Sequence, residues 1–168
     1  MSHSDAPVLL TGAWARLRGD AAPIRFKVFV EEQGIPAALE WDEADTQCLH
    51  CVAVVRGRAV ATGRLLPDGH IGRMAVLPAW RGLGVGARVL RTLMRAAAAR
   101  GHAAAVLSAQ VAVAGFYARE GFVAEGAPYD EVGIPHQAMR RALSDLATNP
   151  CPVPAADAAP GAAGRARP

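Results

Sequence analysis

The sequence predicts an α/β (α+β) domain with a β-α-β unit at its centre, and three observations support this fold class. An apolar run that ends at Pro78 leads through a glycine-rich turn into a helical pattern, and a second apolar run follows at 103–109. Apolar segments separated by turn residues over 47–77 predict neighbouring strands. At 168 residues and 52% hydrophobic content, the chain can bury one sizeable core. We therefore expect a single domain over residues 1–145, followed by a disordered tail rich in Pro, Ala and Gly at 146–168.

The first helix is expected to begin at Asp20, after a short strand at 7–10. Asp20 is a suitable N-cap, Pro23 is tolerated in a first helical turn, and Gly34 stops the helix after about three turns. Carboxylates at the C-terminal end of a helix are disfavoured by the helix dipole. Glu32 lies at that end, so it is a candidate site residue.

A polar loop and three strands are expected to follow this helix. The loop at 39–46 carries four acidic residues, and we expect it to be solvated, as such runs usually are. Apolar runs at 47–55, 59–66 and 71–77 are separated by short turns. This spacing predicts three consecutive antiparallel strands.

The second half of the chain is expected to alternate helices and strands. A helix is predicted at 83–100, and the run at 103–109 is apolar except for Ser108, as expected for a strand buried on both faces. By the handedness rule for such connections, this strand should lie parallel to the one at 71–77. The remaining elements are a helix, a short strand and a last strand, at 111–120, 122–125 and 133–143.

Three glycines make the turn at 81–86 a candidate anion site. Gly82, Gly84 and Gly86 allow backbone conformations that other residues avoid, and the first N–H groups of the helix that follows have no partner within it. Such a helix start suits a phosphate or pyrophosphate. A Walker loop would need a lysine in the turn, but the chain has a single lysine, Lys27. The G-x-G-x-G spacing does not fit a dinucleotide fingerprint.

Charge and hydropathy argue against other classes of partner. The formal charge is only +3, the arginines are scattered, and aromatic residues make up 5% of the chain, which does not fit a nucleic-acid binding protein. No apolar stretch approaches the ~18 residues of a membrane span, and the first residues do not resemble a secretory signal. We therefore expect a cytoplasmic protein with no nucleic-acid or membrane partner.

The cysteines do not predict a metal or redox site. Cys48 and Cys51 form a C-x-x-C pair with His50 between them, but a zinc site would need further ligands and a redox pair would precede a helix. Alternation along the expected strand also directs the two thiols to opposite faces. We expect packing roles for both cysteines and no bound metal.

Two motifs in the expected order resemble the GNAT superfamily of N-acetyltransferases. The pattern Arg-x-x-Gly-x-Gly at 81–86, placed after a strand, is similar to the coenzyme A pyrophosphate loop of that superfamily. About 30 residues later, Phe-Tyr-x-x-x-Gly-Phe at 116–122 matches a second segment. Further segments resemble the ElaA/YjcF-type branch, namely residues 28–36, 71–76 and 133–136. The resemblance spans residues 8–143 and implies a GNAT fold, a mixed sheet of six or seven strands flanked by helices.

The resemblance also implies acetyl-coenzyme A as the cofactor. In such enzymes the strands at 71–77 and 104–109 splay apart to admit pantetheine, which would meet the backbone of Met74, Ala75 and Val76. The pyrophosphate would meet the glycine-rich turn at Arg81, Gly82, Leu83, Gly84, Val85, Gly86 and Ala87. Three further side chains are expected to contact the cofactor. Gln110 stands where many members of the superfamily have an asparagine, and Phe116 and Tyr117 form an aromatic pair.

Tyr117 matches the tyrosine that often acts as the general acid in these enzymes. A phenol with a pKa near ~10 stays protonated at neutral pH and can give its proton to a leaving thiolate. The backbone N–H of Val76 is the expected donor to the oxyanion. Tyr117 and Val76 are therefore the expected catalytic groups on the cofactor side.

The general base has several candidates. The strand at 71–77 lacks the glutamate that some members use, and an ammonium with a pKa near ~10.4 must lose a proton before it attacks. The candidates are Glu32, Asp42, Asp45, His50 and His136. We favour His136 because its strand should border the acceptor cleft. A small-molecule or peptide amine is expected to contact Glu32, Asp42, Asp45, Arg73 and His136, and the acidic loop favours a cationic acceptor.

Two other functions stay open. The first half of the chain is also similar to the acyl-homoserine lactone synthases, which share the fold and use acyl carriers. The similarity rests on Arg25, Phe29, the pattern Glu40-x-Asp42-x-x-Asp45 and the segment at 63–67. We do not expect that family to carry a turn like the one at 81–86. The missing glutamate also leaves room for a non-catalytic acyl-coenzyme A binding module. The expected state is a monomer or a homodimer.

Overall fold

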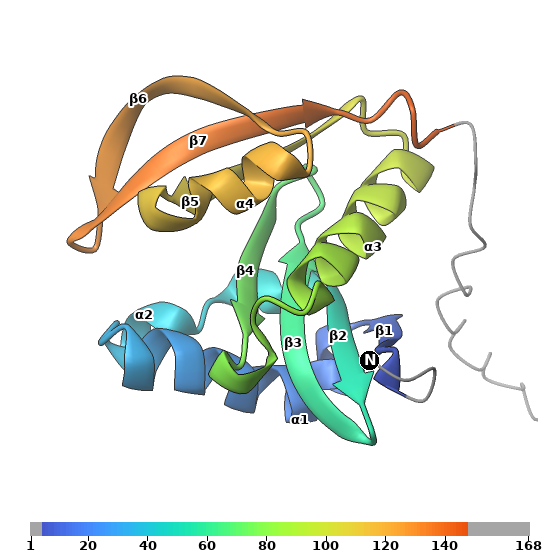
Figure 1. The fold of residues 1–168 in the computed structure, drawn as a ribbon, viewed down its shortest axis with the longest axis vertical. Helices are drawn as coiled ribbons and strands as arrows, with labels where there is room; N and C mark the ends of the chain where they lie inside the picture. The colour runs from blue at the N-terminus through green and yellow to red at the C-terminus, as the bar shows by residue number, and fades with distance from the viewer. Residues whose placement is uncertain (1–4, 148–168) are drawn as a thin grey trace, which may run out of the picture.

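Two antiparallel sheets form the centre of the protein. The structure is a computed structural model that describes residues 5–147. Its strands are β1 (Val8–Gly12), β2 (Leu49–Val55), β3 (Arg58–Leu65), β4 (Ile71–Val76), β5 (Ala104–Gln110), β6 (Val123–Glu131) and β7 (Ile134–Ala142). The first sheet has the order β1-β2-β3-β4 and the second the order β5-β7-β6 (Figure 1). The expected α+β fold class, with seven strands, is confirmed.

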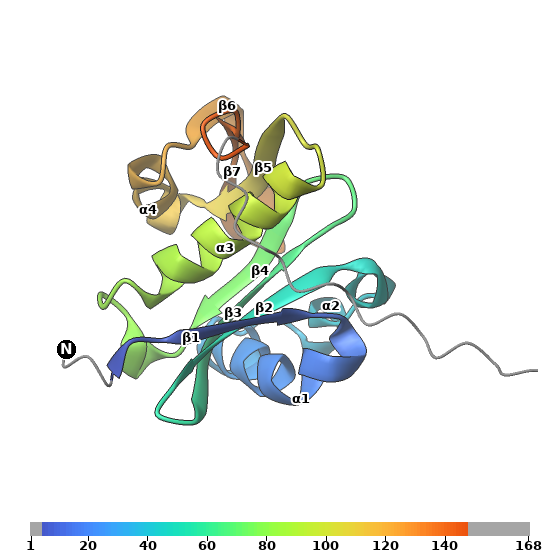
Figure 2. The ribbon, with the colours of Figure 1, turned by 90° about the vertical axis from the view of Figure 1, so that its right-hand side faces the viewer.

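Helices cover both faces of the first sheet. The helical elements are α1 (Trp14–Arg25), the π-helix η2 (Phe26–Glu32), α2 (Ala37–Glu40), α3 (Val85–Ala99), α4 (Ala114–Arg119) and the 3₁₀ turns η3 (Glu43–Gln47), η4 (Pro78–Trp80) and η5 (Val111–Val113). The helices α1 and α2 lie on one face and α3 on the other (Figure 2). In place of the single helix expected at 111–120, the chain forms the 3₁₀ turn η5 followed by α4.

The two sheets meet where β4 and β5 diverge, and we call this boundary the seam. One isolated parallel bridge joins the sheets there, between His70 and Val106. The strands therefore start side by side in the expected parallel sense. From Ile71 onward, β4 pairs with β3 on its other side. The seam is thus the place where two strand edges separate.

The expected apolar face of α3 packs on the sheets. Six residues of α3 are each at most 2% exposed: Val85, Val89, Leu90, Leu93, Met94 and Ala97. On β3, a Cβ added to Gly63 would lie 2.5 Å from Sδ of Met74 and 2.9 Å from Cδ1 of Leu93. Because position 63 has no side chain, α3 can approach the first sheet closely.

The first helix begins earlier than the sequence predicted. It starts at Trp14, so Asp20 lies inside the helix instead of capping it, and Pro23 lies in the helix interior. The helix buries a stripe formed by Leu17, Ala21 and Ile24. Packing of this stripe outweighs the helix-breaking tendency of Pro23. The chain then continues as η2, whose hydrogen bonds span five residues instead of four.

The acidic loop at 39–46 is solvated only in part, whereas a solvated loop was expected. It folds into α2 and η3, and both Glu40 and Asp45 are only 2% exposed. Their carboxylates are bound by arginines from α1 and β3. Burial of these acids is possible because each has a cationic partner.

The strand β5 is buried on one face only, whereas burial on both faces was predicted. Ala105, Leu107 and Ala109 belong to the core that includes α3, while Ser108 is exposed. The strand therefore alternates like one with a single covered face. The next strand, β6, runs on to Glu131, well beyond the expected 122–125, and pairs with β7.

Both cysteines of the C-x-x-C pair are buried free thiols, as expected for packing roles. Cys48 is 5% and Cys51 0% exposed, and burial raises the pKa of Cys51 to about 12. Within residues 5–147, no group of three or more His, Cys, Asp or Glu side chains could hold a metal ion. In the same range no helix is long and apolar enough to cross a bilayer. The predicted tail lies, from residue 148 onward, outside the described residues.

Candidate active site

The end of β4 presents the backbone N–H and C=O of one residue, Val76, to the seam. The N–H of Leu77 donates to the carbonyl oxygen of Val60 on β3, at 2.9 Å. In an antiparallel strand the N–H and C=O of one residue share an edge, and those of the next residue take the opposite edge. Both polar groups of the Val76 backbone therefore face away from β3, toward the seam.

A β-bulge in β4 sets this orientation. One residue of β3, Gly63, faces two residues of β4, Arg73 and Met74. The extra residue reverses the alternation of the strand beyond it. Without the bulge, Ala75 would face the seam in place of Val76. Arg73 takes a φ of 48°, which is in the left-handed region that residues other than glycine seldom adopt.

The glycine-rich turn lies beside the end of β4. Gly82 and Gly84 have φ values of 73° and 78°, and Gly84 is the N-cap of α3. A Cβ added to Gly86 would lie 3.2 Å from Cγ2 of Val76 and 3.6 Å from Cζ of Phe116. The absence of a side chain there lets the first turn of α3 approach both neighbours, and the unpaired N–H groups of that turn suit an anion.

Tyr117 belongs to an aromatic group on α4. Its ring meets Phe116 and Phe122 edge to face, with centres 5.0 and 6.0 Å away, and the residue is 8% exposed. Within the described part of the chain, its hydroxyl has no hydrogen-bond partner. Burial raises the pKa of Tyr117 to about 12, so the hydroxyl keeps its proton at neutral pH.

Comparison with known proteins supplies the family. Residues 17–143 match the family described as acetyltransferase (GNAT) domain. This chain belongs to the GNAT acetyltransferase family. A relative in the same family, the uncharacterized N-acetyltransferase YjcF of Bacillus subtilis (strain 168), is 35% identical over 126 residues, which cover 73% of this chain and 90% of YjcF.

Solved structures agree with the GNAT assignment. An acyl-CoA N-acyltransferase from Pseudomonas aeruginosa is 33% identical with a TM-score of 0.73, covering 82% of this chain and 100% of that one. Escherichia coli ElaA is 25% identical with a TM-score of 0.73, covering 81% and 99%. YjcF and ElaA confirm the predicted branch. The acyl-homoserine lactone synthase BjaI, 15% identical with a TM-score of 0.69 and covering 85% and 87%, shows a shared fold alone.

In this GNAT chain, Arg81 ties the end of η2 to β4. Its Nε donates to the carbonyl oxygen of Val76 at 3.0 Å, and its two terminal nitrogens donate to Glu32 at 2.7 and 2.8 Å. The hydrogen bond from Arg81 lowers the pKa of Glu32. Glu32 is therefore ionised and paired at neutral pH, which makes it a poor base. From the sequence we expected the backbone of Arg81 to contact the cofactor, but not its side chain to pair with Glu32.

Gln110 makes a second bridge from the same helix end. It is the last residue of β5, and its Nε2 donates to Oε1 of Gln33 at 2.8 Å. Glu32 and Gln33 together bond the end of η2 to both borders of the seam. Gln110 was expected in the site from the sequence, whereas its partner Gln33 was not.

His136 lies on β7, opposite Gln110. Its Nδ1 is 2.7 Å from the carbonyl oxygen of Ile134. A carbonyl can only accept, so we assign the proton to Nδ1, which leaves Nε2 as the acceptor. The Glu131 carboxylate lies 3.6 Å from that Nε2, and the ring of Tyr129 stacks on the imidazole at 6.1 Å.

The acidic loop takes part in a group of six paired charged side chains, which we call the charge cluster. The charge cluster consists of Arg25, Arg64, Arg73, Glu40, Asp42 and Asp45. Burial raises the pKa of Glu40, while the hydrogen bonds from Arg64 lower that of Asp42. Three of the four carboxylates of the loop are bound by arginines, and Glu43 is the exposed fourth. The structure therefore gives little support to the expected preference for a cationic acceptor at this loop.

His50 is also enclosed next to this cluster. It is 1% exposed, and its Nε2 lies 2.8 Å from the backbone carbonyl of Asp45. Burial lowers the pKa of His50. A neutral, enclosed imidazole cannot reach an acceptor, so His50 is a poor candidate for the base. Among the described groups, the Nε2 atom of His136 has only the Glu131 carboxylate nearby, at 3.6 Å.

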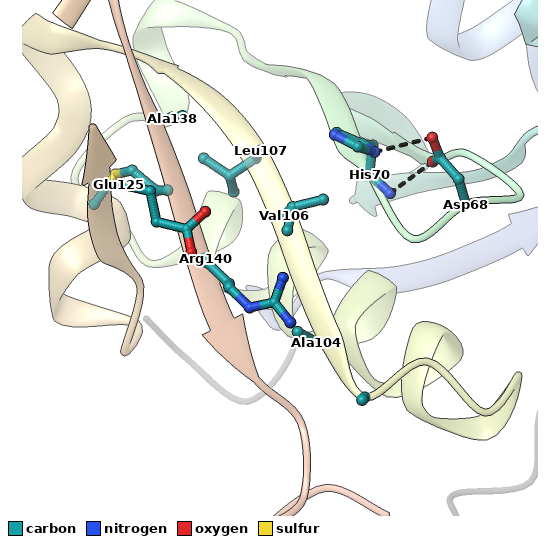
Figure 3. A pocket seen from close by; sticks show the side chains of 10 residues that line it. Asp68, His70, Ala104, Val106, Leu107, Glu125, Ala138 and Arg140 are labelled. Atoms are coloured by element: carbon teal, nitrogen blue, oxygen red, sulfur yellow. Dashed lines mark hydrogen bonds and ion pairs between the residues drawn. The ribbon is translucent and has the colours of Figure 1, made fainter. Parts of the chain in front are cut away.

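A shallow cavity of about 460 Å³ lies elsewhere, on the second sheet and the turn before β4 (Figure 3). Its lining includes His70, Val106, Glu125 and Arg140, and His70 pairs with Asp68 at 3.0 Å. None of the residues expected in the site lines this cavity. The candidate active site is therefore built on the seam and the glycine-rich turn.

Replacing Gly84 with valine is expected to weaken acetyl-coenzyme A binding about tenfold, measured by calorimetry. A β-branched residue at a φ of 78° is strained by about 1–2 kcal/mol or more, and relief of this strain moves the amides of the turn. Gly57 offers a matched control, since its φ is 75° and the space around it is also open, but it lies in the β2–β3 turn. Equal affinity in both valine variants would refute the assignment of the turn.

Proposed function

We propose that this chain transfers an acetyl group from acetyl-coenzyme A to an amine, which attacks the thioester directly. The observation that carries the proposal is the convergence of two distant motifs at the seam. A side chain at Gly86 would touch both Val76 and Phe116. A helix start suited to phosphates, a peptide N–H suited to a carbonyl oxygen and a protonated phenol therefore belong to one region. No atom lies within 4 Å of a Cβ added to Gly82 or Gly84, so the turn has open space beside it for a cofactor.

Each group has a role that follows from its chemistry. Acetyl-coenzyme A supplies the acetyl group as a thioester when it is bound, held by the backbone of Met74 to Val76 and by the amides of 81–87. The N–H of Val76 would donate to the carbonyl oxygen as negative charge develops on it. The Tyr117 hydroxyl would give its proton to the departing sulfur, and burial keeps that proton in place beforehand.

His136 is the proposed base. Its Nε2 is free to accept a proton from the amine, and the Glu131 carboxylate 3.6 Å away can pair with the ring once it is charged. Glu32 and Asp42 are held by arginines, and Asp45 and His50 are enclosed. These contacts support His136 over the other four candidates.

The test measures free thiol released from acetyl-coenzyme A with a panel of primary amines, together with the mass of the product. Amine-dependent release of thiol and an acetylated product is the expected result. Turnover only with a long-chain acyl donor and S-adenosylmethionine would instead support a lactone synthase. Tight binding of acetyl-coenzyme A without turnover would support a binding module, and absence of binding would overturn the proposal.

A further inference from the structure

We propose that Arg73 is a positioning residue for acyl transfer, because its guanidinium, held by Glu40 and Asp42, fixes the β-bulge that turns the Val76 N–H toward the seam. The effect on turnover that we expect from this inference rests on the proposed function. It assigns to Arg73 a structural hold on the oxyanion donor in place of the acceptor contact expected from the sequence.

The backbone at Arg73 needs a restraint. A φ of 48° is unfavourable for a residue with a Cβ, and such a conformation persists only where the surroundings determine it. The side chain supplies the restraint, since Nη2 lies 3.2 Å from Asp42 Oδ2 and Nε lies 3.5 Å from Glu40 Oε1. The side chain is 30% exposed, so these pairs are only partly screened by solvent.

The partners of Arg73 are themselves fixed. Glu40 is 3% exposed in its side chain and accepts from Arg25 Nε at 2.6 Å. The Arg25 guanidinium in turn lies over the rings of Trp14 and Trp41, 5.2 and 5.0 Å from their centres. The carboxylate that holds Arg73 is therefore anchored to α1 and cannot follow a displacement of β4.

Asp42 is fixed from the opposite side of the bulge. Arg64 donates to both of its oxygens, at 2.6 and 2.8 Å. Arg64 lies on β3 and pairs with Gly72, the residue before Arg73. The charge cluster thus connects β3 and β4 at the point where their ladder is interrupted, through side chains in place of the missing backbone pairing.

The orientation of Val76 depends on this bulge. If Arg73 relaxed and the ladder became regular, the peptides beyond it would exchange edges. The Val76 N–H would then face β3, and the donor at the seam would be lost. Loss of one oxyanion donor lowers kcat by about 10²–10³-fold, and a displacement of about 1 Å costs up to about 10²-fold.

The test compares Arg73→Ala with Arg56→Ala. Alanine keeps the Cβ that makes a positive φ unfavourable, so each variant removes the guanidinium and leaves the backbone angle in need of a restraint. Arg56 is a close match, because it has a φ of 50° and pairs with an aspartate, Asp5, but it lies in the β2–β3 turn. We expect Arg73→Ala to lower kcat about 10- to 100-fold with little change in the Kd for acetyl-coenzyme A. Arg56→Ala should keep the wild-type kcat, and Arg73→Lys should show a smaller loss than Arg73→Ala.

Two outcomes would overturn the inference. One is a wild-type kcat in Arg73→Ala, and the other is an equal loss in Arg73→Ala and Arg56→Ala. Amide hydrogen exchange and chemical shifts of Met74 to Val76, measured by NMR without any ligand, give a readout that does not need turnover. They should change in Arg73→Ala and not in Arg56→Ala. If the wild type binds no acetyl-coenzyme A, the proposed function fails, but the NMR comparison still decides whether Arg73 fixes the bulge.

Discussion

Replacing Tyr117 with phenylalanine is expected to lower kcat by about 10²-fold or more, with little change in the Kd for acetyl-coenzyme A. The variant keeps the ring that packs against Phe116 and Phe122 and removes only the proton donor. Stability should change little, because the hydroxyl has no hydrogen-bond partner among the described residues and the ring contacts are kept. Steady-state kinetics, calorimetry and thermal unfolding check these three expectations together.

The chain contains its own control for this variant. Tyr129→Phe also removes a phenolic hydroxyl, one that contacts Ser108, and keeps the ring that stacks on His136. We expect its kcat to stay close to the wild-type value. Equal turnover in Tyr117→Phe and the wild type would remove Tyr117 from the mechanism.

The pH dependence of Tyr117 follows from its burial. Its pKa in the folded protein is about 12, above the ordinary value of ~10. The unfolded chain therefore releases this proton first as the pH rises, and the associated stability is present below pH ~10 and lost between ~10 and ~12. Ionisation of Tyr117 should likewise cause no fall in kcat between pH 7 and ~10.

The Asp45→Asn substitution is expected to lower the free energy of unfolding by about 3–5 kcal/mol. Asp45 accepts hydrogen bonds from Arg25 and Arg64, both at 2.7 Å, and all three side chains are at most 7% exposed. The neutral amide leaves two buried guanidinium groups without that counter-charge. Urea unfolding should show a lower midpoint with an unchanged m value.

An exposed carboxylate provides the comparison for Asp45. Glu31 pairs with Lys27 at 3.4 Å, and both side chains are more than half exposed. Glu31→Gln should change stability by less than about 0.5 kcal/mol, because solvent screens this pair. A similarly small effect of Asp45→Asn would show that the charge cluster does not stabilise the fold.

The sequence predicted the elements whose signal is local. The apolar face of α3 repeats at helical spacing, and the three strands before it are separated by turn residues, so both could be read directly. The start of α1 could not be predicted in this way, because the N-cap signal at Asp20 and the position of Pro23 favoured a later start. Burial against β2 and β3 decided the outcome, and such tertiary packing is not visible in local propensity.

The same distinction holds for the candidate site. The glycine-rich turn and Phe116-Tyr117 carry recognisable spacing, so the approach of the turn to Val76 and Phe116 could be anticipated. The charge cluster joins residues far apart in the sequence, such as Arg25 with Asp45 and Arg64. A signal existed, since Arg25 follows Leu17, Ala21 and Ile24 on the buried stripe of α1, and a buried arginine requires an acidic partner.

The wide winding of η2 (Phe26–Glu32) makes the exact length of this segment part of the site. A regular helix turns by about 100° per residue, so removing one residue and restoring ordinary winding would rotate Glu32 and Gln33 away from their partners. In evolutionary terms, substitutions along η2 can be absorbed one at a time, whereas a single-residue deletion would uncouple the helix from Arg81 and Gln110 in one step. Conserved segment length, more than conserved residue identity, should then mark the relatives that keep both bridges.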